Sequence, residues 1–331
     1  MSCAGGAATA RIRDLIVRLN GTVAVTEPRE DSEIPAFLSA LGLPGLADVH
    51  VHFMPERLMS RVWQYFDDVG ASTGLSRLVW YRLPEQERVD RLRKLGVRVF
   101  TALAYPHKPG MTADLNVWTL TFGRATDGCL LSATLFPEPD VREYVGWAVD
   151  AGAQVFKVHL QVGGFDPNDP LLDPVWGLLS EAGVPVVVHA GHMPAKAAHT
   201  GPEPFERLLR RDPRLPAVIA HMGAPDFDDF LRLAQTHERV MVDTTMVFTS
   251  FTEQYAPFPE RLLPLVRDLG LAGKILLGSD FPNIPSPYAE QLAALVRLDL
   301  GEQWLRAVCW DNADRLFGPL PDRATRSDSG R

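Results

Sequence analysis

The sequence contains few cysteines, and none of them forms a recognisable pair. Its 331 residues include three cysteines, Cys3, Cys129 and Cys309, which lie far apart and make no CxxC motif. An odd number of scattered cysteines indicates neither a disulfide framework nor a zinc ribbon. We therefore expect a protein of the reducing cytoplasm.

Long apolar runs and an excess of positive charge are also missing. No stretch approaches the roughly 18 apolar residues of a transmembrane helix, and residues 1–20 lack the apolar centre of a secretory signal. The formal net charge is −8, which disfavours nucleic acid and anionic membranes as partners. We expect a small-molecule substrate, no nucleic-acid or membrane partner, and a chain that can form a homo-oligomer.

Short apolar runs rich in β-branched residues recur along the middle of the chain. Segments with helical periodicity fill the gaps between them. Near-continuous apolar strands that alternate with amphipathic helices are typical of a parallel sheet covered by helices. The eight predicted strands are Leu46–Phe53, Val97–Ala104, Leu130–Phe136, Gln154–Leu160, Val184–His189, Ala217–His221, Val240–Thr244 and Lys274–Gly278.

Several of the predicted helices end in a glycine before the next strand, as at Gly96, Gly183 and Gly273, where glycine suits a left-handed helix stop. Eight β–α units predict an α/β fold, a (β/α)₈ TIM barrel in ideal or distorted form. A doubly wound open sheet is the alternative, but no GxGxxG follows a strand. The predicted helices are Pro84–Leu95, Val141–Ala151, Asp173–Ala182, Glu203–Arg210, Phe227–Thr236, Pro259–Leu269 and Pro287–Val296.

The chain divides into an N-terminal extension at 1–44, a barrel at 45–318 and a polar tail at 319–331. The barrel contains an aromatic-rich insertion at 54–93, directly after the first strand. We expect this helical insertion to pack over the barrel as an extra pair of helices. Its place beside the first strand also suits a lid over a site.

The first strand carries two histidines, His50 and His52, separated by one residue. Successive side chains of a strand alternate between its faces, so both imidazoles lie on one face and can reach one cation. Neutral ring nitrogens suit Zn²⁺ or a similar transition ion. The alternative is a pair of ordinary histidines on a half-exposed strand, and the other strands decide between the two.

Polar side chains stand at the ends of several later strands. Barrel enzymes place their chemistry at the carboxyl ends of the strands, where these residues would meet. Burying so many polar groups without a shared partner would cost several kcal/mol each, and a metal centre explains them together. The residues are Lys157 and His159 on the fourth strand, His189 on the fifth, His221 on the sixth and Asp280 after the eighth.

This ordered set resembles the amidohydrolase superfamily of metal-dependent barrel hydrolases. More narrowly, it resembles the amidohydrolase-2 branch, which includes the aminocarboxymuconate semialdehyde decarboxylase-like enzymes. The resemblance spans about residues 45–318, and one departure is Leu160, where the branch often has proline after Lys-x-His. The supporting segments are Asp48–Phe53, Phe156–His159, Gly164–Asp169, His221–Gly223 and Leu277–Pro282.

The resemblance implies a metal held by His50, His52, His189 and Asp280, and catalytic roles for Asp280, His221 and Lys157. His221 would bind a second metal or orient a substrate oxygen. We expect Zn²⁺, or another divalent transition metal such as Mn²⁺. A carboxylate that touches both metal and water can accept the water's proton, which is the role we expect for Asp280.

The number of metal ions in the site depends on the chemical state of Lys157. Burial and a nearby metal would lower its pKa until the amine is neutral. The amine could then react with CO₂ to form a carbamate that bridges two metals, as a lysine does in related amidohydrolases. Alternatively, its stem packs in the barrel while the ammonium pairs with a carboxylate or binds substrate. We favour this alternative and a single metal.

Other polar residues lie in loops expected at the mouth of the barrel. For each of them a solvated loop residue is the simpler interpretation, and for His159 a structural hydrogen bond. Asp243, at the end of the seventh strand, could hydrogen-bond to a ligand histidine. The loop candidates for substrate binding are His107, Lys108, His192, Lys196 and His199.

The sequence therefore predicts a metal-dependent hydrolase that cleaves an amide, lactone or related carbonyl bond of a small molecule. A metal-dependent non-oxidative decarboxylase of a small aromatic or unsaturated acid is the alternative. A cation at the mouth, from Arg82, Lys108 or Lys196, would favour the decarboxylase. A ligand-binding barrel without activity is a third hypothesis, disfavoured because the whole ligand set is present.

Overall fold

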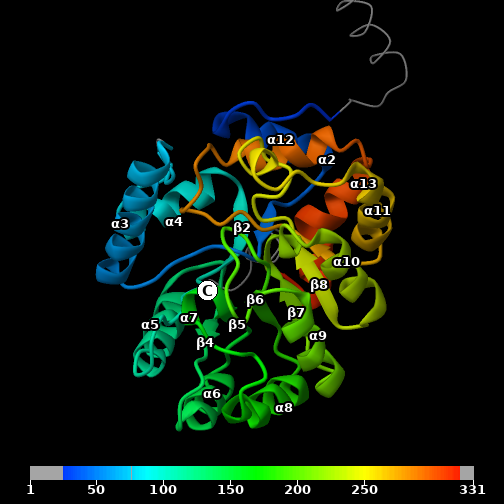
Figure 1. The fold of residues 1–331 in the computed structure, drawn as a ribbon. Helices are drawn as coiled ribbons and strands as arrows, with labels where there is room; N and C mark the ends of the chain where they lie inside the picture. The colour runs from blue at the N-terminus through cyan, green and yellow to red at the C-terminus, as the bar shows by residue number, and fades with distance from the viewer. Residues whose placement is uncertain (1–24, 76, 321–331) are drawn as a thin grey trace, which may run out of the picture.

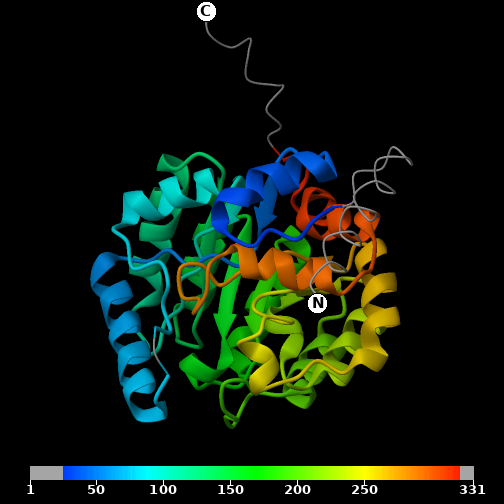
Figure 2. The ribbon, with the colours of Figure 1, turned by 90° about the horizontal axis from the view of Figure 1, so that it is seen from above.

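A computed structural model describes residues 25–75 and 77–320 of the chain. Nearly all of the polar tail predicted at 319–331, and more than half of the N-terminal extension, lie outside the described residues. The described residues form a ring of short parallel strands with helices packed around it (Figures 1 and 2).

The strands pair in two parallel ladders. The first has the order β1-β2-β3 and the second the order β4-β5-β6-β7-β8-β9. Parallel neighbours in chain order are what successive β–α units produce. The strands are β1 (Leu46–Asp48), β2 (Val97–Thr101), β3 (Cys129–Leu130), β4 (Ser132–Thr134), β5 (Val155–His159), β6 (Val186–His189), β7 (Ala217–Ile219), β8 (Val240–Asp243) and β9 (Ile275–Leu276).

The two ladders join into one ring. Only Leu131 separates β3 from β4, so these two strands are halves of a single predicted strand. At the other seam the ladders stop, but the segments that follow β1 and β9 continue side by side. Three backbone hydrogen bonds cross this seam: Val49 N–H to Leu277 O (2.9 Å), His52 N–H to Phe281 O (2.8 Å) and Asp280 N–H to His50 O (2.8 Å). The predicted barrel fold is therefore confirmed, with eight strand positions.

The helices cover the outside of this ring (Figure 1). The seven predicted helices are all present within a few residues of their expected bounds. The α-helices are α2 (Ile34–Leu41), α3 (Glu56–Thr73), α4 (Glu85–Lys94), α5 (Thr112–Ala125), α6 (Val141–Asp150), α7 (Leu160–Gly163), α8 (Asp173–Ala182), α9 (Pro202–Arg211), α10 (Phe227–Thr236), α11 (Leu263–Leu271), α12 (Ala289–Arg297), α13 (Glu302–Arg306) and α14 (Asn312–Phe317).

One barrel helix, α5, was not expected from the sequence. Its buried face includes Asn116 and Thr119 as well as leucines. Asn116 bonds to the backbone of Thr134 through both its amide nitrogen and its oxygen, at 3.1 and 2.7 Å. Polar residues on the buried face hide the apolar period on which a helix prediction depends.

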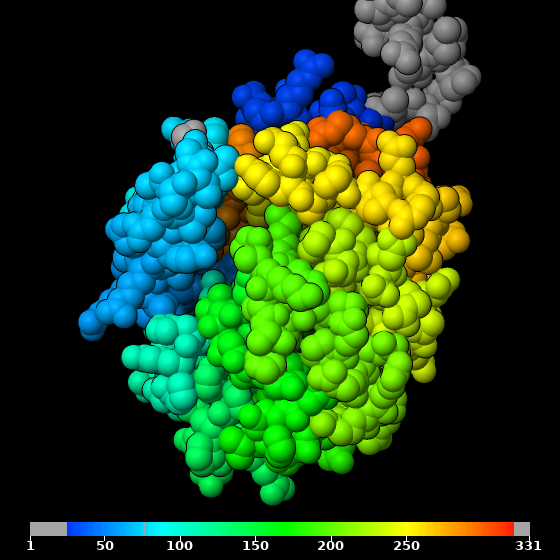
Figure 3. All heavy atoms as spheres, in the orientation of Figure 1, coloured from blue at the N-terminus to red at the C-terminus, as the bar shows by residue number. Residues whose placement is uncertain are grey.

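The insertion at 54–93 contains the 18-residue helix α3 and most of α4. Helix α3 stands at one side of the barrel, and the surface is hollowed where it meets the green and yellow segments (Figure 3). Met54 and Met59 pack with Ala104 and Leu115 in a small apolar cluster, apart from the main core. The insertion therefore reaches the loop after β2 and the start of α5, beside the carboxyl ends of the strands.

Candidate metal centre

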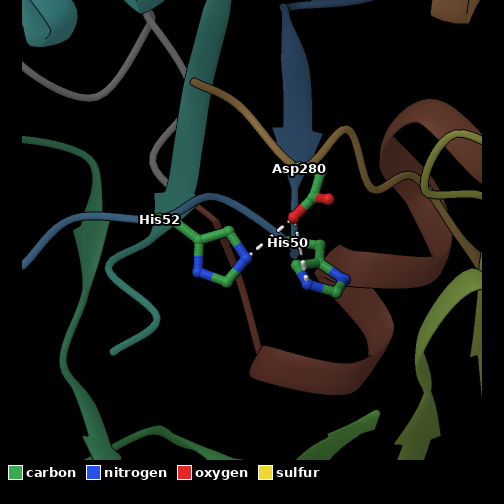
Figure 4. Close-up of side chains that lie close together, drawn as sticks. All are labelled: His50, His52 and Asp280. Carbon is green, nitrogen blue, oxygen red and sulfur yellow. Dashed lines mark ion pairs between the residues drawn. The ribbon is translucent and has the colours of Figure 1, made fainter. Parts of the chain in front are cut away.

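Three side chains gather at the seam between the first and last strands. His50 and His52 follow β1, and Asp280 lies in the loop after β9. One ligand atom from each lies within 4.8 Å of the others, and the two histidines are almost fully buried. Figure 4 shows both imidazoles turned toward the carboxylate. His52 Nε2 lies 2.8 Å from Asp280 Oδ1, and His50 Nε2 lies 3.7 Å from the same oxygen.

Each imidazole is held through its other nitrogen. His52 Nδ1 lies 2.8 Å from the carbonyl oxygen of Leu103, and His50 Nδ1 lies 2.8 Å from Asp243 Oδ2. A carbonyl or carboxylate partner favours the proton on Nδ1, so that Nε2 of each ring is the atom presented to the cluster. The contact predicted between Asp243 and a histidine of the site is confirmed. These partners orient the rings before any cation binds.

The charges of the buried groups suit a cation. Burial and the neighbouring Lys157 lower the pKa of His50 to about 3, so its ring is neutral at pH 7. Burial works against ionisation of Asp243, yet its interactions with His50 and His221 hold its pKa at about 2. Burial also opposes ionisation of Asp280, but contacts with nearby histidines keep the pKa of that carboxyl well below its usual range. Two imidazoles and a carboxylate form a donor set that fits a divalent transition metal.

Asp48 ties the two strands of the site together, a role that the sequence did not reveal. Its carboxylate accepts hydrogen bonds from the backbone N–H groups of His50 and Ser279, both at 3.1 Å. It also accepts from the Ser279 hydroxyl (2.5 Å) and the Tyr288 hydroxyl (2.8 Å). Burial raises the pKa of Asp48 to about 7, against these hydrogen bonds. Asp48 thus fixes the backbone next to two of the three clustered residues.

Two residues of the site have strained backbones. His221 has φ 55° and Asp280 has φ 74°, in the left-handed region that residues other than glycine rarely adopt. Such residues cost about 1–3 kcal/mol each and tend to occur at functional sites. The backbone N–H of His221 donates to Asp243 Oδ1 (2.8 Å), and Asp280 is held by its bond to His50 O. The same carboxylate, Asp243, thus positions both His50 and His221.

Six rings form a closed circuit around the clustered residues. Successive ring centroids lie between 4.0 and 5.5 Å apart, so each ring touches the next. Five of the six are predicted site or candidate residues, and the sixth is a tyrosine that the sequence gave no reason to select. In order, the rings are His50, His52, Tyr105, His159, His189 and His221.

The hydrogen bonds of the three remaining histidines differ. His189 Nε2 lies 2.8 Å from Met193 O and His221 Nδ1 lies 3.1 Å from Thr245 O, so each keeps one nitrogen lone pair free. His159 Nδ1 instead accepts from the Val162 N–H (3.3 Å), which leaves its Nε2 as a donor. In the described part of the chain, the cluster within 4.8 Å does not include His189. Its role as a ligand stays a prediction.

Lys157 is fully buried beside the cluster. Its Nζ lies 3.0 Å from His50 Nε2, the atom that also faces Asp280. Burial lowers the pKa of Lys157 to about 8. The lysine and a cation would compete for the same lone pair, and the role of Lys157 in the site stays a prediction.

The loop candidates lie away from the cluster or have other partners. His192 pairs with Asp226 at 2.7 Å, and His199 lies 3.9 Å from the carboxylate of Asp166. Arg82 forms an ion pair with Asp67 on the surface. The three other mouth candidates, His107, Lys108 and Lys196, are exposed.

A comparison with known protein families identifies the family of this chain. Residues 47–318 match the model of a family described as amidohydrolase, the second of that name. The chain belongs to this family. It is an enzyme and a metal-dependent hydrolase, and His50, His52 and Asp280 form a group that could hold a metal ion. No curated protein matches the sequence.

Solved structures share the fold at low sequence identity. An uncharacterised TIM-barrel protein from Bordetella bronchiseptica is 16% identical (TM-score 0.65; 82% of this chain and 97% of that chain covered). A probable 2-pyrone-4,6-dicarboxylic acid hydrolase from Acinetobacter baumannii, solved with citric acid bound, is 14% identical (TM-score 0.56; 83% and 99%). A 5-carboxyvanillate decarboxylase from Sphingomonas paucimobilis is 16% identical (TM-score 0.55; 82% and 98%). These likenesses establish the TIM-barrel fold.

The sequence predicted no transmembrane helix, and the described residues can be checked for one. None of the helices within them combines the length and apolar character needed to cross a bilayer.

Proposed function

We propose that the protein hydrolyses an amide, lactone or related carbonyl bond of a small molecule, with water as the nucleophile. One observation carries this proposal: two imidazoles and an ionised carboxylate converge within 4.8 Å at the carboxyl ends of the first and last strands. Family membership supports hydrolysis in general, and the donor geometry supports water activation at this point. The substrate itself is not specified by either.

The cation that fits is Zn²⁺, with Mn²⁺ as the alternative, held by His50, His52, Asp280 and His189. For His189 the free nitrogen is Nδ1, because Nε2 bonds to Met193 O. A metal bound there supplies a Lewis acid and lowers the pKa of water to about 7. The residues of the chain then have to orient that water and move its proton.

Asp280 is our candidate for the proton acceptor. Its pKa lies well below the usual range, so the carboxylate is ionised at neutral pH. Its side chain is 17% exposed, against 4% or less for the two clustered histidines, so it is the member of the cluster most open to water. Asp280 would accept the water's proton and pass it to the leaving group.

His221 offers a lone pair rather than a proton. Its Nδ1 faces Thr245 O, and burial lowers the pKa of the ring, so Nε2 is an acceptor at neutral pH. We therefore assign His221 the role of orienting the attacking water by accepting a hydrogen bond. A second metal at this nitrogen is the alternative.

A single metal fits the surroundings of Lys157 best. Its amine already bonds to His50 Nε2, and the described part of the chain contains one cluster of potential metal ligands. The carbamate alternative needs Lys157 to react with CO₂ and bridge two ions. We further propose a cytoplasmic protein that acts on small molecules and does not bind nucleic acid.

Lys157 also keeps the decarboxylase alternative open. A buried amine beside the metal cluster could bind the carboxylate of a small aromatic or unsaturated acid. The decarboxylase and the lactone hydrolase among the similar folds suggest 5-carboxyvanillate and 2-pyrone-4,6-dicarboxylate as first compounds to assay, together with simple lactones and anilides.

Isotope labelling separates the two reactions. The metal-loaded enzyme is incubated in ¹⁸O-labelled water with a compound that it has been found to convert. We expect ¹⁸O in the product carboxylate and no release of CO₂. Asp280→Asn should reduce turnover at least about 10²-fold, the usual effect of losing a general base, whereas the exposed Asp228→Asn should not. Unlabelled product with released CO₂, or near-normal turnover by Asp280→Asn, would contradict the proposal.

A further inference from the structure

Tyr105 lies between the metal cluster and an apolar wall. It follows β2, in the same loop as the predicted mouth residues His107 and Lys108, but the sequence gave no reason to select the tyrosine itself. Its ring meets His52 edge-on, with centroids 5.5 Å apart, and meets His159 at 4.9 Å. It therefore closes the circuit of rings on the side of the barrel opposite His221.

The phenol hydroxyl of Tyr105 has no hydrogen-bond partner in the part of the chain that the structure describes. Within residues 25–75 and 77–320, its oxygen neither donates nor accepts a hydrogen bond, and it is not sealed from solvent. The Tyr105 side chain is only partly buried, unlike that of Tyr144, whose hydroxyl donates to the carbonyl oxygen of Phe136 at 2.8 Å. The hydroxyl of Tyr105 is therefore open to solvent beside the cluster and can donate to a ligand there.

Apolar side chains continue from Tyr105 toward the insertion. The ring packs on the small cluster formed by Met54, Met59, Ala104 and Leu115, with Met111 and Trp63 at its edge. Met54, Met59, Ala104 and Leu115 are themselves buried, whereas Met111, Trp63 and Tyr105 are partly exposed. An apolar group next to Tyr105 would therefore meet the partly exposed side chains of Met111 and Trp63.

We infer that Tyr105 determines substrate specificity: its hydroxyl binds a second acceptor oxygen of the substrate, beyond the carbonyl under attack, while the partly exposed apolar wall formed by Met111 and Trp63 contacts an apolar part. This inference rests on the proposed function for the identity of the attacked carbonyl. The substrate class is a small amide, ester or lactone with an apolar body that also carries an ether, hydroxyl or carbonyl oxygen.

The wall and the donor act on different parts of such a molecule. Apolar contact contributes to affinity but does not depend on direction. A hydrogen bond is directional, so it fixes the orientation of the bound substrate. A neutral hydrogen bond of this kind changes affinity by roughly 3- to 10-fold. Removing the hydroxyl should therefore affect only molecules with the second oxygen.

Two matched anilides test this inference. Butyranilide and methoxyacetanilide have the same length and the same phenyl group, and differ by one CH₂ replaced with an ether oxygen. Their dissociation constants are measured by calorimetry on the zinc-loaded enzyme, and release of aniline is followed separately. Tyr105→Phe keeps the ring and removes only the hydroxyl. The control is Tyr255→Phe, which alters an exposed phenol (54% exposed) outside the circuit of rings.

We expect Tyr105→Phe to weaken binding of methoxyacetanilide about 3- to 10-fold and to leave butyranilide within twofold, with Tyr255→Phe changing neither. Equal weakening of both anilides would mean that the ring only fills space and would overturn the inference. So would no change for either, or no binding of methoxyacetanilide to the parent enzyme at millimolar concentration. The anilides could bind as expected while neither releases aniline and no other carbonyl compound is hydrolysed. That result would contradict the proposed hydrolase function but would still support the substrate-binding role of Tyr105.

Discussion

At the scale of single residues, the site depends on the close approach of the Gly278 backbone to neighbouring side chains as much as on the potential metal ligands. Gly278 lies between the last strand and Asp280, against His50 and the Asp243 side chain that orients it. A Cβ added there would lie 2.1 Å from Thr245 Oγ1, 2.9 Å from His50 Cβ and 3.2 Å from Asp243 Cγ. None of these atoms is the end of a long flexible chain, so the neighbours would have to move.

We expect Gly278→Ala to destabilise the protein by about 1–3 kcal/mol through overpacking and to weaken zinc binding at least tenfold. The matched control is Gly177→Ala in α8, where an added Cβ meets nothing within 4 Å. That change should stabilise the helix by about 0.5–1 kcal/mol. Urea unfolding and competition with a zinc-binding dye measure both effects. Unchanged zinc affinity in Gly278→Ala would show that His50 and Asp243 do not need this contact.

At the scale of elements, helix α3 of the insertion is connected to the loop that carries Asp280. The indole N–H of Trp63 donates to Asn283 Oδ1 at 3.0 Å, and the backbone N–H of Asn283 donates to Asp280 O at 2.8 Å. Arg88 lies over the Trp63 ring, with its guanidinium carbon 5.5 Å from the ring centroid. The insertion therefore forms a wall that restrains a metal-binding loop, in addition to any role as a lid.

Trp63→Phe should keep the packing and remove the hydrogen bond to Asn283. We expect faster loss of zinc to a chelator, about 3- to 10-fold, because the Asp280 loop gains freedom. The melting temperature should change little, since the ring still fills its place. Trp147→Phe, at a half-exposed position on α6 (44% exposed), is the control and should leave the rate unchanged. Equal rates in both variants would mean that α3 does not restrain the loop.

At the scale of the whole molecule, the metal cluster lies at the seam that closes the barrel. His50 and His52 come from one side of this seam and Asp280 from the other, where hydrogen bonds outside the ladders join them. A cation bound to both sides would link the ends of the barrel. Binding to the folded state alone stabilises it by about 2.7 kcal/mol at a free metal concentration of 100 times Kd.

Removal of metal with a chelator should therefore lower the melting temperature by roughly 5 °C. One equivalent of Zn²⁺ should restore it. His52→Ala should melt at the same temperature with and without chelator, because the site is lost while the fold remains. Calorimetry and elemental analysis measure both quantities. A requirement for two equivalents, reduced to one in Lys157→Ala, would instead support the bridging carbamate and two metals.

Much of the fold was predictable because its signals are local. Each strand is a short apolar run, and helices such as α10 show buried residues at helical spacing. Helix α5 was missed because its buried face uses Asn116, which bonds to Thr134 on β4, and Thr119, whose hydroxyl donates to carbonyl oxygens of α5 itself. A helix whose buried face bonds to a distant strand carries no local apolar period.

The sequence by itself determined the parallel α/β barrel and the donor types at the strand ends, since period and residue chemistry are properties of the chain. It placed His50, His52 and Asp280 in one site, and the structure brings their ligand atoms within 4.8 Å. The roles of His189, His221 and Lys157 stay predictions. Only the tertiary structure decided that Asp48 joins the two sides of the seam and that Tyr105 completes the circuit of rings. Both depend on contacts between strands and loops far apart in the chain, and such contacts exist only once the ring of strands has closed.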